Sequence, residues 1–477
     1  VKVEVVKPGF INFFFDEHYF NKNVESILRD PSEYSKSNIF SGKKIFFEHS
    51  QPNPFKAFHI GHLMGNCIGE SVSRIIKANG AETQVASYHG DVGLQVAKSV
   101  WAMKNGISLD ESYAYGHKAY EDDEKSKAEI IEINKKIYDE SDVEISKIYE
   151  QGRKESLENF DAIYKRLDSE FDFHFFESES GEIGAELVRE NMGSVFEEGE
   201  NGAVIFKGEN FEPKTHIRVF LNSEGLPTYE AKELGLAQIK KDFFEYDKSI
   251  TVTANEQDSF FKVVEVAIGE VFPELKGKLK HLSHGMLKLP SGKMSSRTGT
   301  VISAESLIDQ VKEKVKEKID DEIVSEIIAI GAIKYSILRQ AIGGDIIFDF
   351  DKSISFEGDS GPYLQYATVR ANSILKKSEG VVSVSEKLPE NWQTTNIERL
   401  IERFPSVVER AGSDYAPHHI VTYLIELSGE FNSFYASHKI IDEGDITSPY
   451  RLAITKAFVQ VMTSGLTLLG IKVPERM

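Results

Sequence analysis

Cysteine and long apolar runs are what this sequence has least of. Its single cysteine, Cys67, can form neither an internal disulfide nor a zinc site built from several cysteines. This scarcity suits a reducing compartment, and we expect the cytoplasm. No apolar run approaches the roughly 20 residues that span a membrane, and the start "VKVEVVKPGF" lacks the basic-then-apolar pattern of a signal peptide. We therefore expect neither secretion nor a membrane partner.

Basic residues are also in deficit. The chain has 56 Lys and Arg against 76 Asp and Glu, which gives a formal charge of −20 at pH 7. This argues against a generic basic protein that coats nucleic acid. It does not exclude nucleic-acid binding, because local basic patches act independently of the total charge. With 477 residues the chain is too long for one compact core, so we expect two to four domains.

The first part of the chain alternates strands and helices. "KKIFFEHS" is a short apolar strand, residues 60–79 have apolar side chains at helical spacing, and "ETQVASYH" is a second strand. Strand, helix and strand in this order predict a parallel sheet. Further strands at 249–255 and 281–289 extend this pattern, so we assign residues 41–320 to an α/β domain. Within it, a charged amphipathic stretch at about 105–215 predicts a helical insertion.

The two ends of the chain differ from this pattern. Residues 1–40 contain the strand-like "VKVEVV", a Pro-Gly turn and the aromatic run "FINFFF", which together are typical of the tail of a small α+β module. Residues 321–477 contain several long segments with an apolar stripe at a period of 3.6 residues. This second pattern predicts an all-α helical bundle.

The junction between the first strand and the first helix predicts a phosphate site. It reads "PNPFKAFHIGHL", residues 52–63, and places His59 and His62 on one face of the helix start. A helix N-terminus presents unpaired N–H groups and the positive end of the helix dipole, and Gly61 leaves room for a ligand at the backbone. These groups suit polyphosphate oxygens. Two histidines are also a metal-ligand pattern, but neither a cysteine nor a well-placed carboxylate completes a site nearby, so we expect no metal ligands.

A second candidate phosphate site is the loop "LPSGKMSSRTGT", residues 289–300. It follows a predicted strand and offers two cations and several hydroxyls to phosphate oxygens. Its residues of interest are Lys293, Ser295, Ser296 and Arg297. Taken alone, such a loop is equally typical of an ordinary polar surface.

Together, "HIGH" at 59–62 and "KMSSR" at 293–297 resemble the paired motifs of the class I aminoacyl-tRNA synthetases. The resemblance implies a doubly wound, Rossmann-like sheet on which both motifs meet over ATP, with Mg²⁺ implied by the ATP chemistry. It implies that His59 and His62 contact the ATP phosphates. Lys293, in a catalytic loop with Ser295 and Ser296, would stabilise the leaving pyrophosphate. Arg297 stands where the family has a second lysine, and its guanidinium keeps the charge with a different geometry.

The residues around these motifs resemble the arginyl-tRNA synthetases in particular. The similar stretches span nearly the whole chain: "EHSQPNPFKAFHIGHL", "SYHGDVGLQ", "PTYEAKELGLA", "NEQDSFF", "GPYLQYATVR" and "TLLGIKVPERM". The resemblance implies a pocket in which carboxylates and amide oxygens bind the guanidinium of arginine in a fork geometry. The implied arginine-binding residues are Glu48, Asn53, Tyr229, Glu233 and Gln257.

The resemblance also assigns Lys56, Gly61 and Met286 to ATP, although a solvated lysine is the alternative for Lys56. Two positions depart from the family pattern. Glu233 stands where the family usually has aspartate, so the carboxylate sits on a longer side chain, and Val92 stands where it often has tryptophan. Because a site that hydrogen-bonds a distinctive substrate group rejects analogues lacking that group, we expect no separate editing domain.

The bundle resembles the anticodon-binding region of the family. Aromatic and basic side chains there can stack on unpaired bases, but aromatics at helical spacing are more often part of a helical core. The candidate tRNA-binding residues are Tyr363, Tyr366, Arg370, Phe434, Tyr435 and Met477. The start of the chain has no initiator Met and resembles the end of the family's N-terminal RNA-binding module, so we expect most of that module to be missing. We also expect a monomer.

The predicted function is therefore that of an arginyl-tRNA synthetase, which activates arginine with ATP and transfers it to the 3′-terminal adenosine of its tRNA. A small-molecule nucleotidyltransferase would share the His-x-Gly-His site but would need neither the "KMSSR" loop nor the bundle. A non-catalytic RNA-binding relative would have eroded motifs, whereas His59, His62 and Lys293 are present. A cysteine-specific synthetase is disfavoured because its zinc-binding cysteines are absent.

Overall fold

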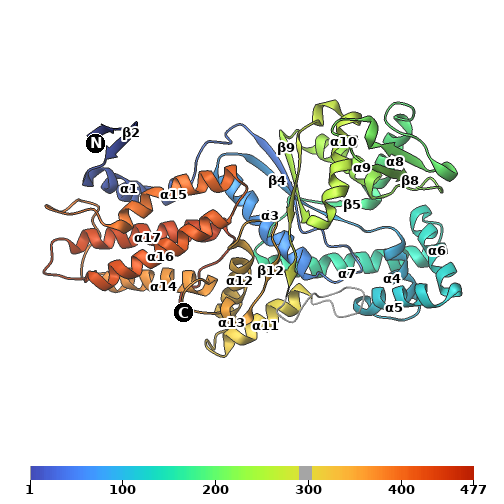
Figure 1. Cartoon of the computed structure of the whole chain (residues 1–477). Helices are drawn as coiled ribbons and strands as arrows, with labels where there is room; N and C mark the ends of the chain where they lie inside the picture. The colour runs from blue at the N-terminus through green and yellow to red at the C-terminus, as the bar shows by residue number, and fades with distance from the viewer. Residues whose placement is uncertain (1, 289–302) are drawn as a thin grey trace.

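The computed structural model describes residues 2–288 and 303–477 of the chain. The predicted loop residues Lys293, Ser295, Ser296 and Arg297 lie outside the described residues. In Figure 1 a twisted sheet stands near the middle of the molecule, with a bundle of long helices at its left and two further lobes at its right. Among the described residues, no helix is both long enough and apolar enough to cross a membrane.

The central sheet consists of five parallel strands. Their bounds are β3 Lys44–Glu48, β4 Glu82–His89, β5 Phe173–Phe176, β9 Lys248–Ala254 and β10 Leu279–His284. In space they follow the order β10-β9-β3-β4-β5, and every neighbouring pair is parallel. The chain runs outward from β3 through β4 to β5 and then returns to the other side of β3. The strand order therefore reverses between β3 and β9, which is where doubly wound sheets bind their ligands.

Helices cover both faces of this sheet. Ile45 and Phe47 of β3 pack with α3 (Ile60–Ala78) on one face, and Phe46 packs with α9 (Tyr229–Phe243) and α10 (Asp258–Val271) on the other. Burial on both faces explains why β3 reads as an unbroken apolar run instead of an alternating one. The predicted fold class, a doubly wound Rossmann-like domain followed by a helical region, is confirmed.

The predicted helical insertion at 105–215 is wrong in its second half. Residues 94–167 are helical: α4 Leu94–Lys104, α5 Leu109–Asp122, α6 Glu124–Asp139 and α7 Val143–Leu167. The chain then enters the central sheet as β5, continues through α8 (Glu177–Glu190), and forms a small antiparallel sheet of β6 Glu197–Glu198, β7 Val204–Lys207 and β8 Ile217–Leu221. The strand β5 has four residues, which is too short for its pattern to stand out beside a charged helix of 25 residues.

The C-terminal part of the molecule is mainly helical, as the apolar stripes predict. Its elements are β11 Leu287–Lys288, α11 Ala304–Lys316, α12 Glu322–Leu338, β12 Ile346–Ile347, α13 Phe350–Ser353, α14 Gly361–Ser378, α15 Asn396–Ser413, α16 His418–Ser437 and α17 Ser448–Leu468. One continuous apolar core joins this bundle to the α3 face of the sheet. A boundary at residue 320 therefore separates an α/β region from a helical region, but the two regions share one apolar core.

The N-terminal segment, residues 1–40, contains a hairpin and two helices. β1 (Lys2–Val6) and β2 (Phe10–Phe14) form an antiparallel hairpin, and α1 (Glu17–Arg29) and α2 (Pro31–Tyr34) follow. The hydroxyl of Tyr19 donates to Glu402 at 2.7 Å, and that of Tyr34 donates to the Ile401 carbonyl at 3.0 Å. Residues 17–34 are thus attached to the bundle. This leaves the hairpin as the part of 1–40 that fits a separate module.

Candidate active site

A cavity of about 660 Å³ lies where the strand order reverses. Its walls come from the loop that follows β3, the start of α3, the end of β9, the start of α10 and the first turns of α9. A volume of this order is typical of sites that enclose small molecules. His59, Gly61 and His62 line it together with Asn53, Tyr229, Glu233 and Gln257, so the predicted phosphate and arginine residues meet in one cavity.

The two histidines form a reciprocal cap on α3. His59 precedes the helix, and its Nδ1 accepts from the backbone N–H groups of Gly61 at 3.1 Å and His62 at 3.4 Å. The Nδ1 of His62 accepts from the His59 N–H at 3.3 Å, and the two rings stack 3.6 Å apart. Because both Nδ1 atoms accept hydrogen bonds, each neutral ring carries its proton on Nε2. The pair therefore offers two Nε2–H donors to a ligand.

Both rings stay neutral at physiological pH. Burial and the nearby ammonium of Lys56 lower the pKa of His59 to about 4. Burial and the neighbouring His59 hold the pKa of His62 well below its usual value. The site thus presents neutral imidazole donors and not imidazolium cations.

The geometry shows a structural reason for Gly61. A Cβ at Gly61 would lie 2.9 Å from Cε1 of His59, so the glycine makes room for the His59 ring, and it also lines the cavity. The amides of Gly61 and His62, which the sequence predicted as phosphate donors, are already bound to His59. The Nε2–H groups of the two imidazoles therefore replace these amides as the hydrogen-bond donors at the N-terminus of α3.

Lys56 is held by the helices that follow β4. Its ammonium donates to Oε1 of Gln95 at 2.9 Å and lies 4.4 Å from the ring centre of Tyr113 in α5. Burial lowers the pKa of Lys56 to about 8. These contacts do not fit the alternative of a freely solvated lysine, although Lys56 itself does not line the cavity.

Asn53 is fixed by the backbone of the loop after β4. Its Oδ1 accepts from the N–H of Gly90 at 2.9 Å. A Cβ at Gly90 would lie 2.7 Å from that oxygen, so a side chain at this position would displace Asn53. Because its oxygen is committed, Asn53 can offer a ligand its amide N–H₂ group.

Glu48 lies behind the cavity and does not line it. Its side chain is fully buried and accepts from the ammonium of Lys240 at 2.8 Å and from the amide of Gln51. Ser50 and Gln51 both have left-handed backbone, with φ of 77° and 54°. Backbone strain of this kind persists where many surrounding contacts fix the conformation of the loop. Glu48 therefore shapes the wall through Gln51, and the predicted direct contact with arginine is not supported.

Glu233 is one of four glutamates that line the cavity. It lies one turn after Tyr229 on α9, so both side chains share a face. Burial and the nearby Glu48 raise the pKa of Glu233 to about 8. Lys240 is hydrogen-bonded to Glu48, and within the described residues Glu233 makes no ion pair of its own. The cavity thus contains a carboxyl group that a bound cation would ionise.

Glu177 is a cavity residue that the sequence reasoning missed. It follows β5 directly, lines the cavity, and accepts from the ammonium of Lys232 at 2.6 Å. Glu230 also lines the cavity and lies 3.4 Å from Arg218 of β8. The signal that could have found Glu177 is its place at the carboxyl end of a parallel strand, but that signal requires β5 to be recognised.

The structure does not bring Met286 into the cavity. Its N–H donates to Oδ1 of Asp345 at 2.8 Å, and its carbonyl accepts from the Ile346 N–H at 2.8 Å. Both backbone groups are therefore used to join β11 to β12. The residue on this side that does line the cavity is His284.

The chain returns to the described region beside the histidine pair. The N–H of Ala304 donates to the carbonyl of Phe58 at 2.8 Å, and the backbone of Ser303 pairs with His59. Ser303 and Ala304 therefore lie next to the predicted phosphate site. Lys293 and Arg297 lie outside the described part, and their roles remain predictions.

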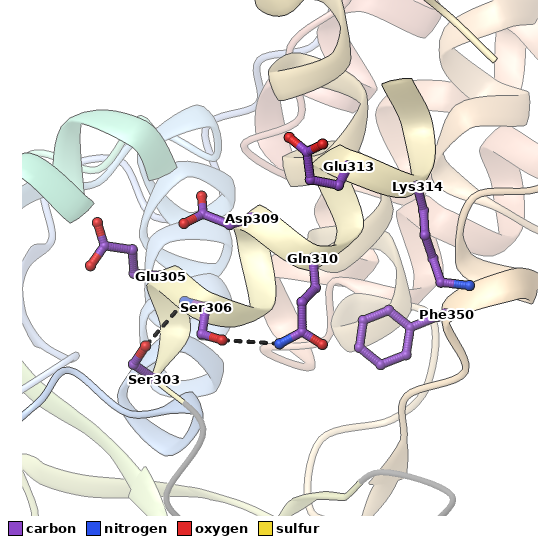
Figure 2. A pocket seen from close by; sticks show the side chains of 8 residues that line it. All are labelled: Ser303, Glu305, Ser306, Asp309, Gln310, Glu313, Lys314 and Phe350. Atoms are coloured by element: carbon purple, nitrogen blue, oxygen red, sulfur yellow. Dashed lines mark hydrogen bonds between the residues drawn. The ribbon is translucent and has the colours of Figure 1, made fainter. Parts of the chain in front are cut away.

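A second hollow lies along α11 (Figure 2). It is lined by Ser303, Glu305, Ser306, Asp309, Gln310, Glu313, Lys314 and Phe350. Its side chains serve the structure: Ser303 accepts from the Ser306 N–H, Asp309 pairs with Arg166 at 2.6 Å, and Lys314 pairs with Asp351 at 2.7 Å. No predicted site residue lines this hollow. In the part of the chain that is described, no three side chains are grouped to hold a metal ion.

The predicted tRNA-binding residues divide into core and surface. The prediction is wrong for Phe434, which is 3% exposed and packs inside the bundle. Tyr366 and Tyr435 are 41% and 37% exposed, and the guanidinium of Arg370 lies 4.4 Å from the Tyr435 ring centre. Tyr363 accepts from Asn432 at 3.0 Å, and Met477 packs against the edge of the core. Surface exposure thus selects Tyr366 and Tyr435, and the half-buried Arg370 contacts Tyr435.

Comparisons with known proteins agree along the whole chain. A family model described as "tRNA synthetases class I (R), catalytic domain" matches residues 23–350, and one described as "DALR anticodon binding domain" matches 364–477. The arginine–tRNA ligase of Borrelia hermsii is 31% identical over 507 residues, covering 98% of this chain and 86% of the relative. That of Borreliella burgdorferi is 30% identical over 492 residues, covering 95% and 83%.

Solved structures share the fold. The arginyl-tRNA synthetase of Thermus thermophilus superposes with a TM-score of 0.74 at 24% identity, covering 100% of this chain and 89% of that one. The enzyme of Plasmodium falciparum gives 0.78 at 19% identity, covering 100% and 86%. Because the catalytic-domain model spans more than half of the chain and the curated relatives are matched over most of their length, the chain belongs to the arginyl-tRNA synthetase family of class I tRNA synthetases.

Proposed function

We propose that this cavity binds arginine and ATP side by side, forms arginyl-adenylate, and passes the arginine to the 3′-terminal adenosine of a tRNA. The observation that carries the proposal is the charge distribution of the cavity wall. Glu48 already has Lys240 as its partner, whereas Glu233 faces the cavity with its pKa raised to about 8. A guanidinium group would supply the missing positive charge and two or more hydrogen-bond donors.

We assign the guanidinium of arginine to Glu233, Tyr229 and Glu177. The first two share a face of α9, and Glu177 approaches from the end of β5. Because arginine presents its N–H groups in a plane, carboxylates on two sides can bind different edges of the group. At the other end of the substrate, Asn53 and Gln257 would hold the α-amino and carboxylate groups.

We assign the ATP phosphates to the Nε2–H groups of His59 and His62. In the first step a carboxylate oxygen of arginine attacks the α-phosphorus, a C–O–P linkage forms, and the bond from that phosphorus to the bridging oxygen of pyrophosphate breaks. Negative charge then grows on the departing pyrophosphate. Neutral donors placed before the reaction stabilise such charge without reorganising. In the second step the tRNA hydroxyl attacks the carbonyl carbon, and AMP leaves.

The remaining family residues keep the roles that the resemblance implies. Lys293, Ser295, Ser296 and Arg297 would contact the pyrophosphate from the loop, and Lys56 would add a charge near the histidines. Mg²⁺ would enter with ATP and neutralise part of the phosphate charge. No protein ligand for it can be named among the described residues, so every step above relies on side chains of the chain itself.

The helical region would read the tRNA through the surface of α14 and α16. Tyr366 and Tyr435 are exposed there, with the half-buried Arg370 beside Tyr435, and these side chains can stack on unpaired bases. In this proposal residues 41–320 perform the chemistry, residues 321–477 bind the anticodon, and the hairpin at the start of 1–40 is the end of an RNA-binding module. The protein would work as a cytoplasmic monomer, which light scattering with and without tRNA can check.

The test is arginine-dependent exchange of pyrophosphate into ATP, measured with and without the arginine-accepting tRNA, followed by aminoacylation of that tRNA. Arginine should support both reactions, and lysine and citrulline should support neither. Charging of a different amino acid with none of arginine would refute the specificity. The inactive-relative alternative predicts no exchange under either condition.

A further inference from the structure

His284, the last residue of β10, lines the active-site cavity but has no part in the functions assigned so far. Its side chain is deeply buried, with the residue 3% exposed. Its Nδ1 lies 2.7 Å from the carbonyl oxygen of Gly285. A carbonyl oxygen can only accept, so Nδ1 must carry the ring proton in this contact.

The remaining ring nitrogen is therefore a hydrogen-bond acceptor. Burial lowers the pKa of His284, which keeps the ring neutral and leaves a lone pair on Nε2. No group in the described part of the chain donates to this nitrogen. A ligand that fills the cavity covers this nitrogen, and an acceptor that is covered without a donor costs free energy, so a ligand gains by bringing a donor to it.

The position of Nε2 relative to α3 identifies the part of the ligand that it meets. A Cβ built on Gly65 would lie 3.4 Å from Nε2 and 3.7 Å from the carbonyl of Val252. Gly65 comes four residues after Gly61, so Nε2 lies about 6 Å farther along the helix than the histidine pair. Near it lie the backbone of Gly65, the carbonyl of Val252 and the backbone nitrogen of Ser50, which carry no net charge. Such a wall suits a flat ring better than it suits phosphates or a guanidinium.

We propose that Nε2 of His284 accepts a hydrogen bond from the 6-amino group of adenine and so selects ATP over GTP. This rests on the proposed function, in which the phosphates occupy the Nε2–H groups of His59 and His62. Guanine carries an oxygen at the same ring position, and this oxygen would face the lone pair of Nε2 without a proton between them. Guanine would then have to shift within the cavity, or Nε2 of His284 would lack a hydrogen-bond donor.

The experiment combines substitutions at His284 with changes in the nucleotide. Purine riboside triphosphate lacks the 6-amino group and otherwise resembles ATP. The wild type should lose about tenfold in kcat/KM for exchange on going from ATP to this analogue. His284→Phe keeps a flat ring but removes the acceptor, so it should lose about tenfold with ATP and nothing further with the analogue. His284→Gln, which keeps an acceptor, should recover part of the preference for ATP.

The KM for arginine should stay unchanged in both variants, and His419→Gln on the distant α16 should behave as wild type throughout. The proposal is overturned if His284→Phe still prefers ATP over the analogue as strongly as wild type does. It is also overturned if the variant instead loses its preference for ATP over 2′-deoxy-ATP, because the acceptor would then serve the ribose. Calorimetric binding of the same nucleotides tests His284 separately, since a wild type that binds ATP but shows no exchange contradicts the proposed function alone.

Discussion

The raised pKa of Glu233 predicts that arginine binding depends on pH in a range where a carboxyl group ordinarily does not titrate. Burial and Glu48 hold the pKa of Glu233 near 8, so below that pH the free protein carries this carboxyl group mainly protonated. The guanidinium of arginine stays charged across the whole range. Because the ionised carboxylate is the form that pairs with a cation, kcat/KM for arginine should rise with pH until the group is ionised and then level off.

The size of the effect follows from the titration. At pH 6.5 about 3% of Glu233 is ionised, and at pH 8.5 about three quarters, so kcat/KM for arginine should rise about 25-fold over this interval. Glu233→Gln cannot ionise, so its profile should be flat. The variant should also lose a charge-assisted hydrogen bond of about 1.5–3 kcal/mol. Its kcat/KM for arginine at high pH should therefore be roughly 10–150-fold below that of the wild type. Glu233→Asp, the residue usual in the family, should keep the pH dependence.

The assay is pyrophosphate exchange at saturating ATP, supported by calorimetric titration of arginine without ATP. The calorimetric arm removes any contribution from groups that bind the phosphates. Glu426→Gln changes an exposed carboxylate that pairs with Arg403 on the bundle, and it should leave the profile as in the wild type. A flat wild-type profile, or an equal slope in Glu233→Gln, would refute the assignment of Glu233 to the guanidinium.

Three further substitutions test contacts within the molecule. Gly90→Ala puts a methyl group 2.7 Å from Oδ1 of Asn53 and 3.0 Å from Oε1 of Glu177, so the KM for arginine should rise about 10–100-fold, and an unchanged KM would argue against both side chains as arginine ligands. Lys56 has a pKa near 8 and loses its charge at higher pH, so the KM of the wild type for ATP should rise between pH 7.5 and about 9. The KM of Lys56→Met for ATP should not change over this interval. The same rise in KM in both proteins would contradict a role of Lys56 in phosphate binding. Lys334→Met leaves the carbonyls of Leu167 and Gly470 without the ammonium that binds both, and it should lower stability by about 2–4 kcal/mol; an unchanged thermal unfolding midpoint would contradict this.

The sequence predicted the parts of this molecule that repeat a strong local pattern. The βαβ unit around α3 and the long helices of the bundle follow from hydrophobic period and length, and both are confirmed. The four-residue strand β5 gives no such signal, because it occupies an edge of the sheet and follows a long charged helix. Missing β5 also meant missing Glu177, whose place in the cavity depends on where that strand ends.

Side-chain roles were predictable by type but not by atom. The sequence placed His59 and His62 at the start of a helix, yet which ring nitrogen faces the ligand depends on the reciprocal cap that the fold creates. Phe434 and Tyr435 are neighbours in one helix, and one points into the core while the other is exposed. An aromatic residue at helical spacing fits either position. Its role is decided by packing between helices that are distant in the sequence.

The two titrations near pH 8 act in opposite directions, and this has a consequence for the reaction as a whole. Glu233 must lose its proton to pair with arginine, whereas Lys56 must keep its proton to attract phosphate. When both substrates are below saturation, exchange should therefore follow a bell-shaped pH profile centred near 8, with only about a quarter of the molecules in the productive state at the maximum. Neutral imidazoles at His59 and His62 fit the same logic, because a permanent cation there would repel the guanidinium that Glu233 attracts. The histidine pair thus leaves positive charge in the cavity to the substrates, and the opposite charges of arginine and the ATP phosphates then attract each other within one cavity.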